Sequence, residues 1–375
     1  MTTPLHDATY VYRDDGPRAV FRASSAALSR RLLGRPRHAF LTTVLSENDI
    51  PGVNRATAIR LVIRGYHPRA AILYDVDHYE LEDYLSQYER ERTRTINGPA
   101  ASKVIDKYRF HDALESFPEH RSKIYGILHR GQFYSDLDVA DSIDALQAID
   151  ERFQIASRLI AKPKASAGGG AGVTLIERTD SGYRLNDTEQ TEQGVSDWLD
   201  QLENYLLTAF VQQSEYGDSL FPDSANTLRI VTMIDDAGPF IAAAVQRIGT
   251  SASAPVDNWS AGGLSAHVDD AGVLSAATRS PLHGDLQWFD EHPDTGVPIR
   301  GRSVPAWDDI RNRILAMTAA LEDVIYLGWD VLPTEDGFTI IEGNAHIDVN
   351  SIQVHKPLLA DRRVRAFYKR HGVLN

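Results

Sequence analysis

The pattern of apolar and polar positions divides the chain into a helical first part and a strand-rich second part. In residues 18–35 and 78–95, apolar residues recur at helical spacing with charged residues between them. Another helix is expected from about Lys107. Because no strands alternate with crossover helices here, we predict a mostly helical region over residues 1–100 and no dinucleotide-binding domain.

From about residue 155 onward, β-branched and aromatic residues predict strands. Residues 158–163 and 172–178 resemble two strands, and 226–249 resembles a pair of strands joined by a turn. A strongly amphipathic helix is expected over 308–324, followed by a hairpin within 326–345. This mixture of antiparallel hairpins and helices predicts an α+β fold.

Composition narrows the class of protein. A chain of 375 residues can form two or three packed domains. Neither a membrane span nor a signal peptide is apparent, so we expect a cytoplasmic protein. The lack of cysteine excludes disulfides, thiolate zinc sites and cysteine nucleophiles.

The charge balance adds a prediction about the environment. There are 52 Asp and Glu against 39 Lys and Arg, and the net charge of −13 comes mostly from Asp. Such self-repulsion is well tolerated in concentrated salt, because the Debye length falls to about 3 Å near 1 M. We therefore favour a halophilic protein over an ordinary acidic bacterial one. No basic stripe indicates a nucleic-acid partner.

A cluster of glycines lies between two predicted strands, in the sequence AKPKASAGGGAGVTLIERTD. A flexible linker is one interpretation, but the flanking strands favour the tip of a hairpin. A P-loop is excluded because Val173 follows the last glycine, and a dinucleotide fingerprint would need a helix next. We interpret the segment as a tip whose N–H groups cover phosphates, with Lys162 reaching in from the preceding strand. The glycines are Gly168, Gly169, Gly170 and Gly172.

The predicted hairpin GWDVLPTEDGFTIIEGN carries the strongest candidate for chemistry. Glu342 and Asn344 are two residues apart on a strand and share one face. If the turn centres on Asp336, Asp330 lies opposite Glu342, with Cβ atoms roughly 5 Å apart. Three oxygen-bearing side chains that converge in this way suit Mg²⁺. A solvated hairpin face is the alternative, but the flanking residues are too apolar for it.

These parts, in this order, resemble the ATP-grasp superfamily, in particular its sugar-transfer-associated members. The resemblance covers roughly residues 60–355, and the D…E-x-N metal set is its most specific element. It implies an ATP-grasp fold in which two α+β lobes, 101–213 and 214–375, hold ATP between them after a helical region over 1–100. One or two Mg²⁺ ions, with Mn²⁺ as the alternative, would accompany the nucleotide.

The resemblance also implies roles for residues outside the metal set. Lys107 and Lys162 correspond to the two phosphate-binding lysines, and the glycine cluster to the lid over the phosphates. The hinge that usually holds adenine and ribose would be formed by Gln212, Gln213 and Glu215.

Residues 226–232 and 245–263 resemble the segments in which glutamate-adding ligases of this superfamily carry two arginines and an Asn-x-x-x-Gly-Gly motif. This likeness implies that the transferring phosphoryl group or a later oxyanion is stabilised by Arg229, Arg247 and Asn258.

The chain departs from the peptide-forming members after the metal strand. They continue with Ser-x-Pro-Gly, whereas this chain continues with AHIDVNSIQ, so the chemistry of the acceptor is not carried over. His346, Asp348 and His355 follow the metal strand and are equally consistent with facing the acceptor or with being ordinary polar residues.

The implied activity is that of an ATP-dependent carboxylate–amine ligase. A carboxylate would attack the γ-phosphate to give an acyl phosphate, which an amine then captures. Its partners would be small molecules, such as an amino acid and a sugar acid or saccharide precursor, and many relatives self-associate. The alternatives are a kinase of a small molecule or sugar, and a silent nucleotide-binding partner of a glycosyltransferase.

Overall fold

The computed structural model describes residues 52–135, 142–165, 172–281 and 285–374, together with Arg37 and Ile50. The helix predicted over residues 18–35 lies outside this part of the chain, as do Gly168, Gly169 and Gly170. The α-helices are α3 (Arg55–Ile63), α4 (Ala70–Leu73), α5 (Gln87–Arg92), α6 (Ser102–Ile105), α7 (Lys107–Ala113), α8 (Ala145–Phe153), α9 (Glu192–Leu199), α10 (Glu215–Leu220), α11 (Trp307–Ala320), α12 (Asn350–Gln353) and α13 (Arg362–Arg370).

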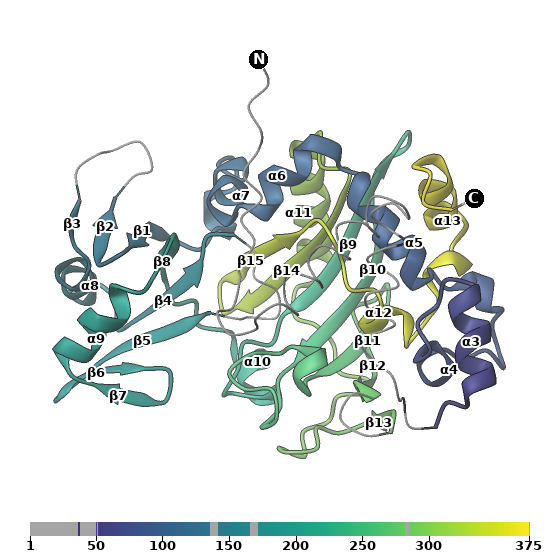
Figure 1. Ribbon diagram of the computed structural model, residues 1–375, viewed down its shortest axis with the longest axis horizontal. Helices are drawn as coiled ribbons and strands as arrows, with labels where there is room; N and C mark the ends of the chain where they lie inside the picture. The colour runs from purple at the N-terminus through teal and green to yellow at the C-terminus, as the bar shows by residue number, and fades with distance from the viewer. Residues whose placement is uncertain are drawn as a thin grey trace, which may run out of the picture.

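The first of two antiparallel sheets has the strand order β3-β2-β1-β8-β4-β5-β6-β7 (Figure 1). Helices α8 and α9 pack on one face of it. Ala161 pairs with Thr174, which confirms that the glycine cluster connects two strands of a hairpin. The strands are β1 (Ile124–His129), β2 (Gln132–Tyr134), β3 (Ile143–Asp144), β4 (Arg158–Pro163), β5 (Thr174–Thr179), β6 (Gly182–Leu185), β7 (Thr188–Gln190) and β8 (Tyr205–Ala209).

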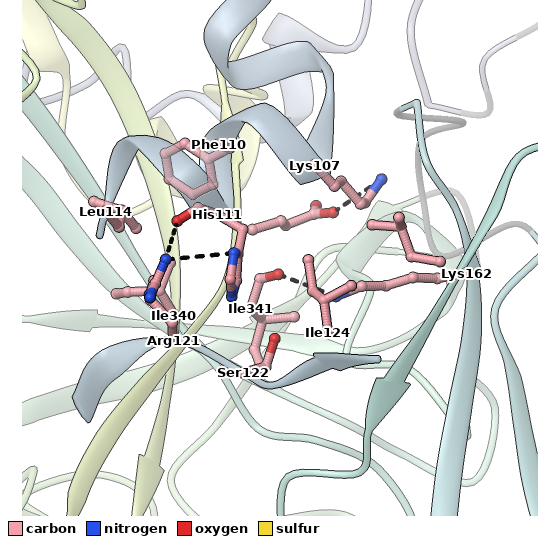
Figure 2. Close-up of a pocket in the computed structure, with 12 residues that line it drawn as sticks. Lys107, Phe110, His111, Leu114, Arg121, Ser122, Ile124, Lys162, Ile340 and Ile341 are labelled. Atoms are coloured by element: carbon pink, nitrogen blue, oxygen red, sulfur yellow. Dashed lines mark hydrogen bonds and ion pairs between the residues drawn. The ribbon is translucent and has the colours of Figure 1, made fainter. Parts of the chain in front are cut away.

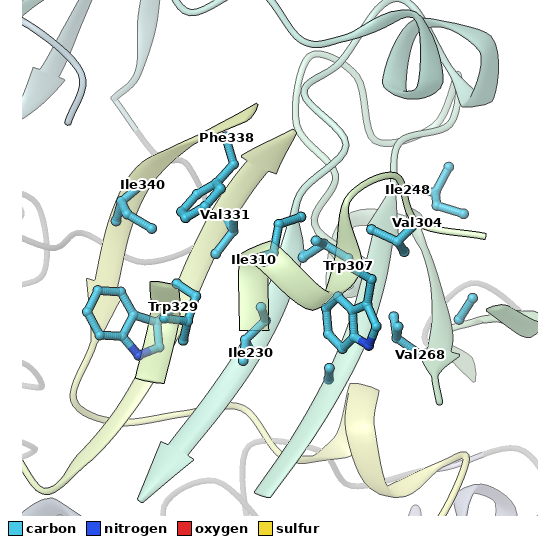
Figure 3. Close-up of a cluster of buried hydrophobic side chains, with 14 of the residues drawn as sticks. Ile230, Ile248, Val268, Val304, Trp307, Ile310, Trp329, Val331, Phe338 and Ile340 are labelled. Atoms are coloured by element: carbon cyan, nitrogen blue, oxygen red, sulfur yellow. The ribbon is translucent and has the colours of Figure 1, made fainter. Parts of the chain in front are cut away.

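The second sheet has the strand order β13-β12-β11-β10-β9-β14-β15. Helix α11 packs on one face, over the large apolar cluster shown in Figure 3, and α12 and α13 pack on the other. The strands are β9 (Leu228–Asp235), β10 (Gly238–Ile248), β11 (Leu264–Val268), β12 (Leu274–Arg279), β13 (Gln287–Phe289), β14 (Tyr326–Thr334) and β15 (Gly337–Asn344).

Alternation along β14 decides which side chains face which layer. Trp329 and Val331 are fully buried in the cluster beneath α11. Tyr326 points to the opposite face, into the cluster that includes residues of α12 and α13. Because side chains alternate along a strand, Asp330 shares the face of Tyr326. The side chain of Asp330 therefore points to the face of the sheet that carries α12, and away from α11.

The helical segment near the N-terminus is less regular than its pattern predicts. Instead of one helix over residues 78–95, the structure has the 3-10 helix Leu81–Asp83, then α5, then the 3-10 helix Thr93–Thr95. Ser86 starts α5 with a capping box, in which its side chain and that of Glu89 bond each other's backbone N–H. Among the described residues, no helix combines the length and the apolar character that a membrane crossing requires.

Candidate active site

A solvent-open pocket of about 350 Å³ is lined by residues of both sheets and of α7 (Figure 2). The first sheet contributes side chains from β1, β4 and β8, and the second contributes β15. The pocket brings together both predicted phosphate-binding lysines and one predicted metal ligand. Its lining residues are Lys107, Phe110, His111, Leu114, Arg121, Ser122, Ile124, Lys162, Leu206, Ile340, Ile341 and Glu342.

Helix α7 holds Lys107 in the pocket. Asp106 caps this helix by accepting hydrogen bonds from two backbone N–H groups of its first turn. The backbone N–H of Lys107 donates to the carbonyl oxygen of Lys164 at 2.9 Å, which ties the start of the helix to the end of β4. The Phe110 ring packs on Gly343, where a Cβ atom would come within 2.6 Å of the ring. The bare backbone of β15 thus lets α7 approach the hairpin.

The hairpin of β14 and β15 confirms one prediction and corrects another. Asp330 pairs with Glu342, as predicted. The turn occupies residues 335–336, so it is centred half a residue before Asp336, where we expected its centre. A β-bulge at Ile341 inserts one extra residue and restores the predicted pairing at the acidic positions.

The bulge also contacts Lys162. The Nζ atom of Lys162 donates to the carbonyl oxygen of Ile341 at 3.4 Å, and Lys107 Nζ lies 3.7 Å from Glu342 Oε2. Burial lowers the pKa of Lys162 to about 8; the Glu342 carboxylate opposes this shift, and the Lys107 ammonium adds to it. With Arg121, the pocket is therefore lined by three cationic side chains and one carboxylate.

Asp330 is buried, and arginines bind both of its oxygens. Arg229 contacts Oδ1 through Nε and Oδ2 through Nη2, the latter at 2.9 Å, while Arg247 Nη1 lies 3.1 Å from Oδ2. Burial alone would raise the pKa of Asp330, but the two guanidinium groups outweigh it and hold this pKa below its usual value. The two arginines predicted to act in catalysis are thus paired with a carboxylate of the predicted metal set.

Sequence reasoning missed Asp257. This buried side chain accepts hydrogen bonds from the Thr227 backbone N–H at 2.8 Å and from the Thr227 hydroxyl, and its Oδ1 lies 2.8 Å from Arg247 Nη2. The only signal was an acid directly before Asn258. Asn258 itself caps a 3-10 helix by accepting from the Ser260 N–H at 3.2 Å, so its side chain is engaged locally.

The predicted metal set keeps acceptor capacity for a cation. A carboxylate offers about four acceptor positions, and the arginine contacts use three of those on Asp330. Asn344 Nδ2 lies 3.5 Å from Glu342 Oε1, so these two side chains are neighbours. In the described ranges, no group of three or more His, Cys, Asp or Glu side chains is arranged to hold a metal. The oxygen atoms of Asp330, Glu342 and Asn344 nevertheless suit a hard cation whose remaining ligands are phosphate or water oxygens.

The predicted hinge residues differ in what their side chains do. Gln213 is buried and bonds within the protein, accepting from the Asn226 N–H at 2.9 Å and donating to Asp218 and two carbonyl oxygens. Gln212 accepts from Arg158 on β4 and is exposed. Glu215 begins α10 with its side chain exposed.

The remaining candidates lie outside the pocket. Gly172 has φ +77°, and a Cβ atom there would come within 2.7 Å of the Tyr205 hydroxyl. His346 lies between Arg90 and Glu91, and burial with nearby arginines lowers its pKa to about 2. Asp348 accepts from the backbone N–H at the start of α12, and His355 Nε2 lies 3.3 Å from a β11 hydroxyl.

Solved structures of several enzymes are similar to this chain at low sequence identity. N5-carboxyaminoimidazole ribonucleotide synthetase, solved with ADP, is 10% identical over 72% of this chain and 52% of its own, with a TM-score of 0.40. The D-alanine–D-alanine ligase of Coxiella burnetii is 10% identical over 73% and 60%, with a TM-score of 0.37. D-cycloserine synthetase is 16% identical over 73% and 72%, with a TM-score of 0.38. The chain spans about half the length of the first of these.

The family itself is identified by a different comparison. No match is found among curated proteins. A model of the family described as sugar-transfer associated ATP-grasp matches residues 87–366, which include both lysines, both arginines and the acidic hairpin. The match covers well over half of the sequence. The chain therefore belongs to the sugar-transfer associated ATP-grasp family.

Proposed function

We propose that this protein is an ATP-dependent ligase that activates a carboxylate as an acyl phosphate and joins it to an amine. One observation carries the proposal: Lys107 and Lys162, from α7 and the first sheet, meet Glu342 of the second sheet in one pocket. A nucleoside triphosphate between the sheets would place its phosphates against two cations. Family membership makes ATP the nucleotide of choice.

The pocket supplies positioning and charge, which is most of what phosphoryl transfer requires. Lys107 and Lys162 would bind the phosphates and hold them in line with the incoming carboxylate. The carboxylate oxygen forms a bond to the γ-phosphorus as the bond to ADP breaks. The amine then bonds to the carbonyl carbon, inorganic phosphate leaves, and the nitrogen loses a proton.

Glu342, Asn344 and Asp330 would hold Mg²⁺ in this reaction. The cation would supply charge that neutralises the β- and γ-phosphate oxygens. Arg229 and Arg247 would keep Asp330 ionised, because their charges already lower its pKa. In this proposal the two arginines bind Asp330 and keep it charged, and Asp330 in turn helps to hold the cation that binds the phosphates.

The test is ADP release from MgATP in concentrated KCl, with a panel of carboxylates and hydroxylamine as a trap. We expect one carboxylate to give both ADP and a hydroxamate, since hydroxylamine captures an acyl phosphate. ADP with a phosphorylated acceptor, but no hydroxamate or free phosphate, would instead identify a kinase. Tight nucleotide binding without ADP formation for any acid would contradict the proposed turnover.

The lowered pKa of Lys162 predicts a pH dependence of nucleotide binding. Below about pH 8 the Lys162 amine is already protonated. Above this pH it is neutral in the free protein and has to take up a proton when the phosphates bind. The affinity for ADP should therefore fall above pH 8, by as much as about tenfold for each pH unit. Calorimetric titrations of the wild type and of Lys162→Arg between neutral and alkaline pH would measure this. Arginine stays charged throughout, so equal slopes for the two proteins would contradict the prediction.

A further inference from the structure

A second pocket, of about 560 Å³, lies between the helices near the N-terminus and the segment that follows β15. Figure 1 shows α3, α4 and α5 on the side of the second sheet that carries α12. This volume includes space that is open to solvent, so the pocket is a recess of the surface and not an enclosed cavity. Its lining residues are His67, Arg69, Ala70, Leu73, Tyr74, Gln87, Arg90 and Asn350.

The charge of this pocket is opposite to that of the whole protein. Two arginines, Arg69 and Arg90, line it, and none of the described lining residues is acidic. The protein as a whole has a net charge of −13. Burial and the Arg69 charge lower the pKa of His67 to about 4, so this imidazole is neutral at pH 7. Arg90 Nη1 also lies 3.5 Å from a carboxylate oxygen of the buried Glu91, so one of the two guanidinium groups already has an acidic neighbour. Two guanidinium groups at one recess favour an anionic ligand over a cationic one.

The other polar groups of the pocket are held in fixed positions. The Tyr74 hydroxyl donates to Asn350 Oδ1 at 3.2 Å and accepts from Gln353 Nε2 at 3.1 Å. Because the amide oxygen of Asn350 accepts from Tyr74, its amide nitrogen is the group that can donate to a ligand. The Gln87 amide nitrogen bonds Glu91 at 3.3 Å, which directs that side chain to act as an acceptor through its oxygen. A donor on Asn350 and an acceptor on Gln87 suit hydroxyl groups, because a hydroxyl both donates and accepts hydrogen bonds.

The pocket is connected to the acidic hairpin through Ile347. Arg90 Nε donates to the Ile347 carbonyl oxygen at 2.7 Å. On the other side, Ile347 packs against Gly328, where a Cβ atom would lie 3.0 Å from its side chain and 3.4 Å from Arg229 Cδ. Ile347 and Arg229 thus both lie against Gly328, and Arg90 is linked to this contact through the Ile347 carbonyl oxygen.

We propose that this pocket binds one of the two substrates, a small molecule that carries a carboxylate or phosphate group on a hydroxyl-rich framework. Arg69 and Arg90 would bind the anionic group, and Gln87 and Asn350 would bind hydroxyls. The role as a substrate site rests on the proposed ligase function, whereas the binding itself does not.

Binding of three probes to the full chain by calorimetry would test the proposal: glucuronate, glucose 6-phosphate and glucose. The variants are Arg69→Gln and Asn350→Ala, with Arg60→Gln as the matched control, because Arg60 is an exposed arginine of α3 outside the pocket. We expect one charged sugar to bind more tightly than glucose, and Arg69→Gln to weaken it by about tenfold or more. Asn350→Ala should weaken it less, and Arg60→Gln should leave it unchanged.

The two charged probes distinguish a carboxylate from a phosphate ligand. Equal affinity for glucose, equal losses in Arg69→Gln and Arg60→Gln, or no saturable binding of any probe at millimolar concentration would overturn the proposal. ADP binding, measured in the same samples, separates this inference from the proposed function. Sugar-acid binding without ADP binding would refute the ligase and leave the pocket assignment standing, and the converse would refute the pocket alone.

Discussion

Replacing Glu342 with glutamine is expected to lower the rate of ADP formation by roughly 10²–10³-fold or more, while the protein stays folded. Glutamine keeps the shape of the side chain but removes the charge that faces Lys107 at 3.7 Å. It also removes the best-exposed acidic ligand of the predicted metal set, since the Glu342 side chain is 28% exposed against 6% for Asp330. The loss should therefore fall on catalysis and not on folding.

The measurement is the rate of ADP release, together with the midpoint of urea unfolding. Asp336→Asn is the matched control, because it changes the same charge at the exposed turn of the same hairpin. We expect the unfolding free energy of Glu342→Gln to stay within about 1 kcal/mol of the wild type, as for a partly exposed ion pair. A variant with wild-type turnover would refute the role of Glu342 in metal binding.

Asp330→Asn should instead destabilise the whole protein, by about 3–5 kcal/mol. Its carboxylate is the partner of Arg229, whose side chain is only 11% exposed. Removing one member of a buried pair leaves the other charge in the interior without compensation. Arg247 is affected less, since it keeps its contact with Asp257.

Urea unfolding of Asp330→Asn, Arg229→Met and the double variant would measure this coupling. The double variant should lose less stability than the sum of the single ones, because neither charge is then buried alone. The pKa of Asp330 is lowered in the folded state, so its stabilising effect is present above about pH 4 and is lost at lower pH. The difference between wild type and Asp330→Asn should shrink accordingly in acid, and a difference that stays constant would contradict the ion-pair account.

These two variants separate explanations that activity alone would confuse. Loss of turnover in Asp330→Asn could follow from unfolding, whereas loss in Glu342→Gln could not. The catalytic role of the acidic hairpin should therefore be judged from Glu342→Gln. Asp330→Asn measures how much the buried ion pair stabilises the fold.

Local patterns were sufficient to predict much of the fold and part of the site. Period-two alternation and turn residues gave the β14–β15 hairpin and the pairing of Asp330 with Glu342. The half-residue error at the turn is explained by the bulge at Ile341, which has no marker in a run of apolar residues. The bulge mattered for function, because its carbonyl oxygen accepts from Lys162.

Contacts between distant parts of the chain were beyond such reasoning. Arg229 and Asp330 are 101 residues apart, and no local pattern indicates that they bind each other. The same holds for Asp257 and for the pocket between Tyr74 and Asn350, whose members are 276 residues apart. The sequence showed which residue types were present there, but not which of them meet.

The contact of Arg90 with Ile347 has a consequence for how the chain reaches its folded state. It joins residues 257 positions apart, so α5 leaves the ribosome long before its partner is synthesised. Until then Leu85, which is fully buried and bonds Gln353, has no C-terminal layer to cover it. Leu85 and α5 therefore stay exposed to chaperones and proteases until residues 347–353 are made. A truncation that removes residues 347–353 should for this reason also disturb the packing of Leu85 and α5.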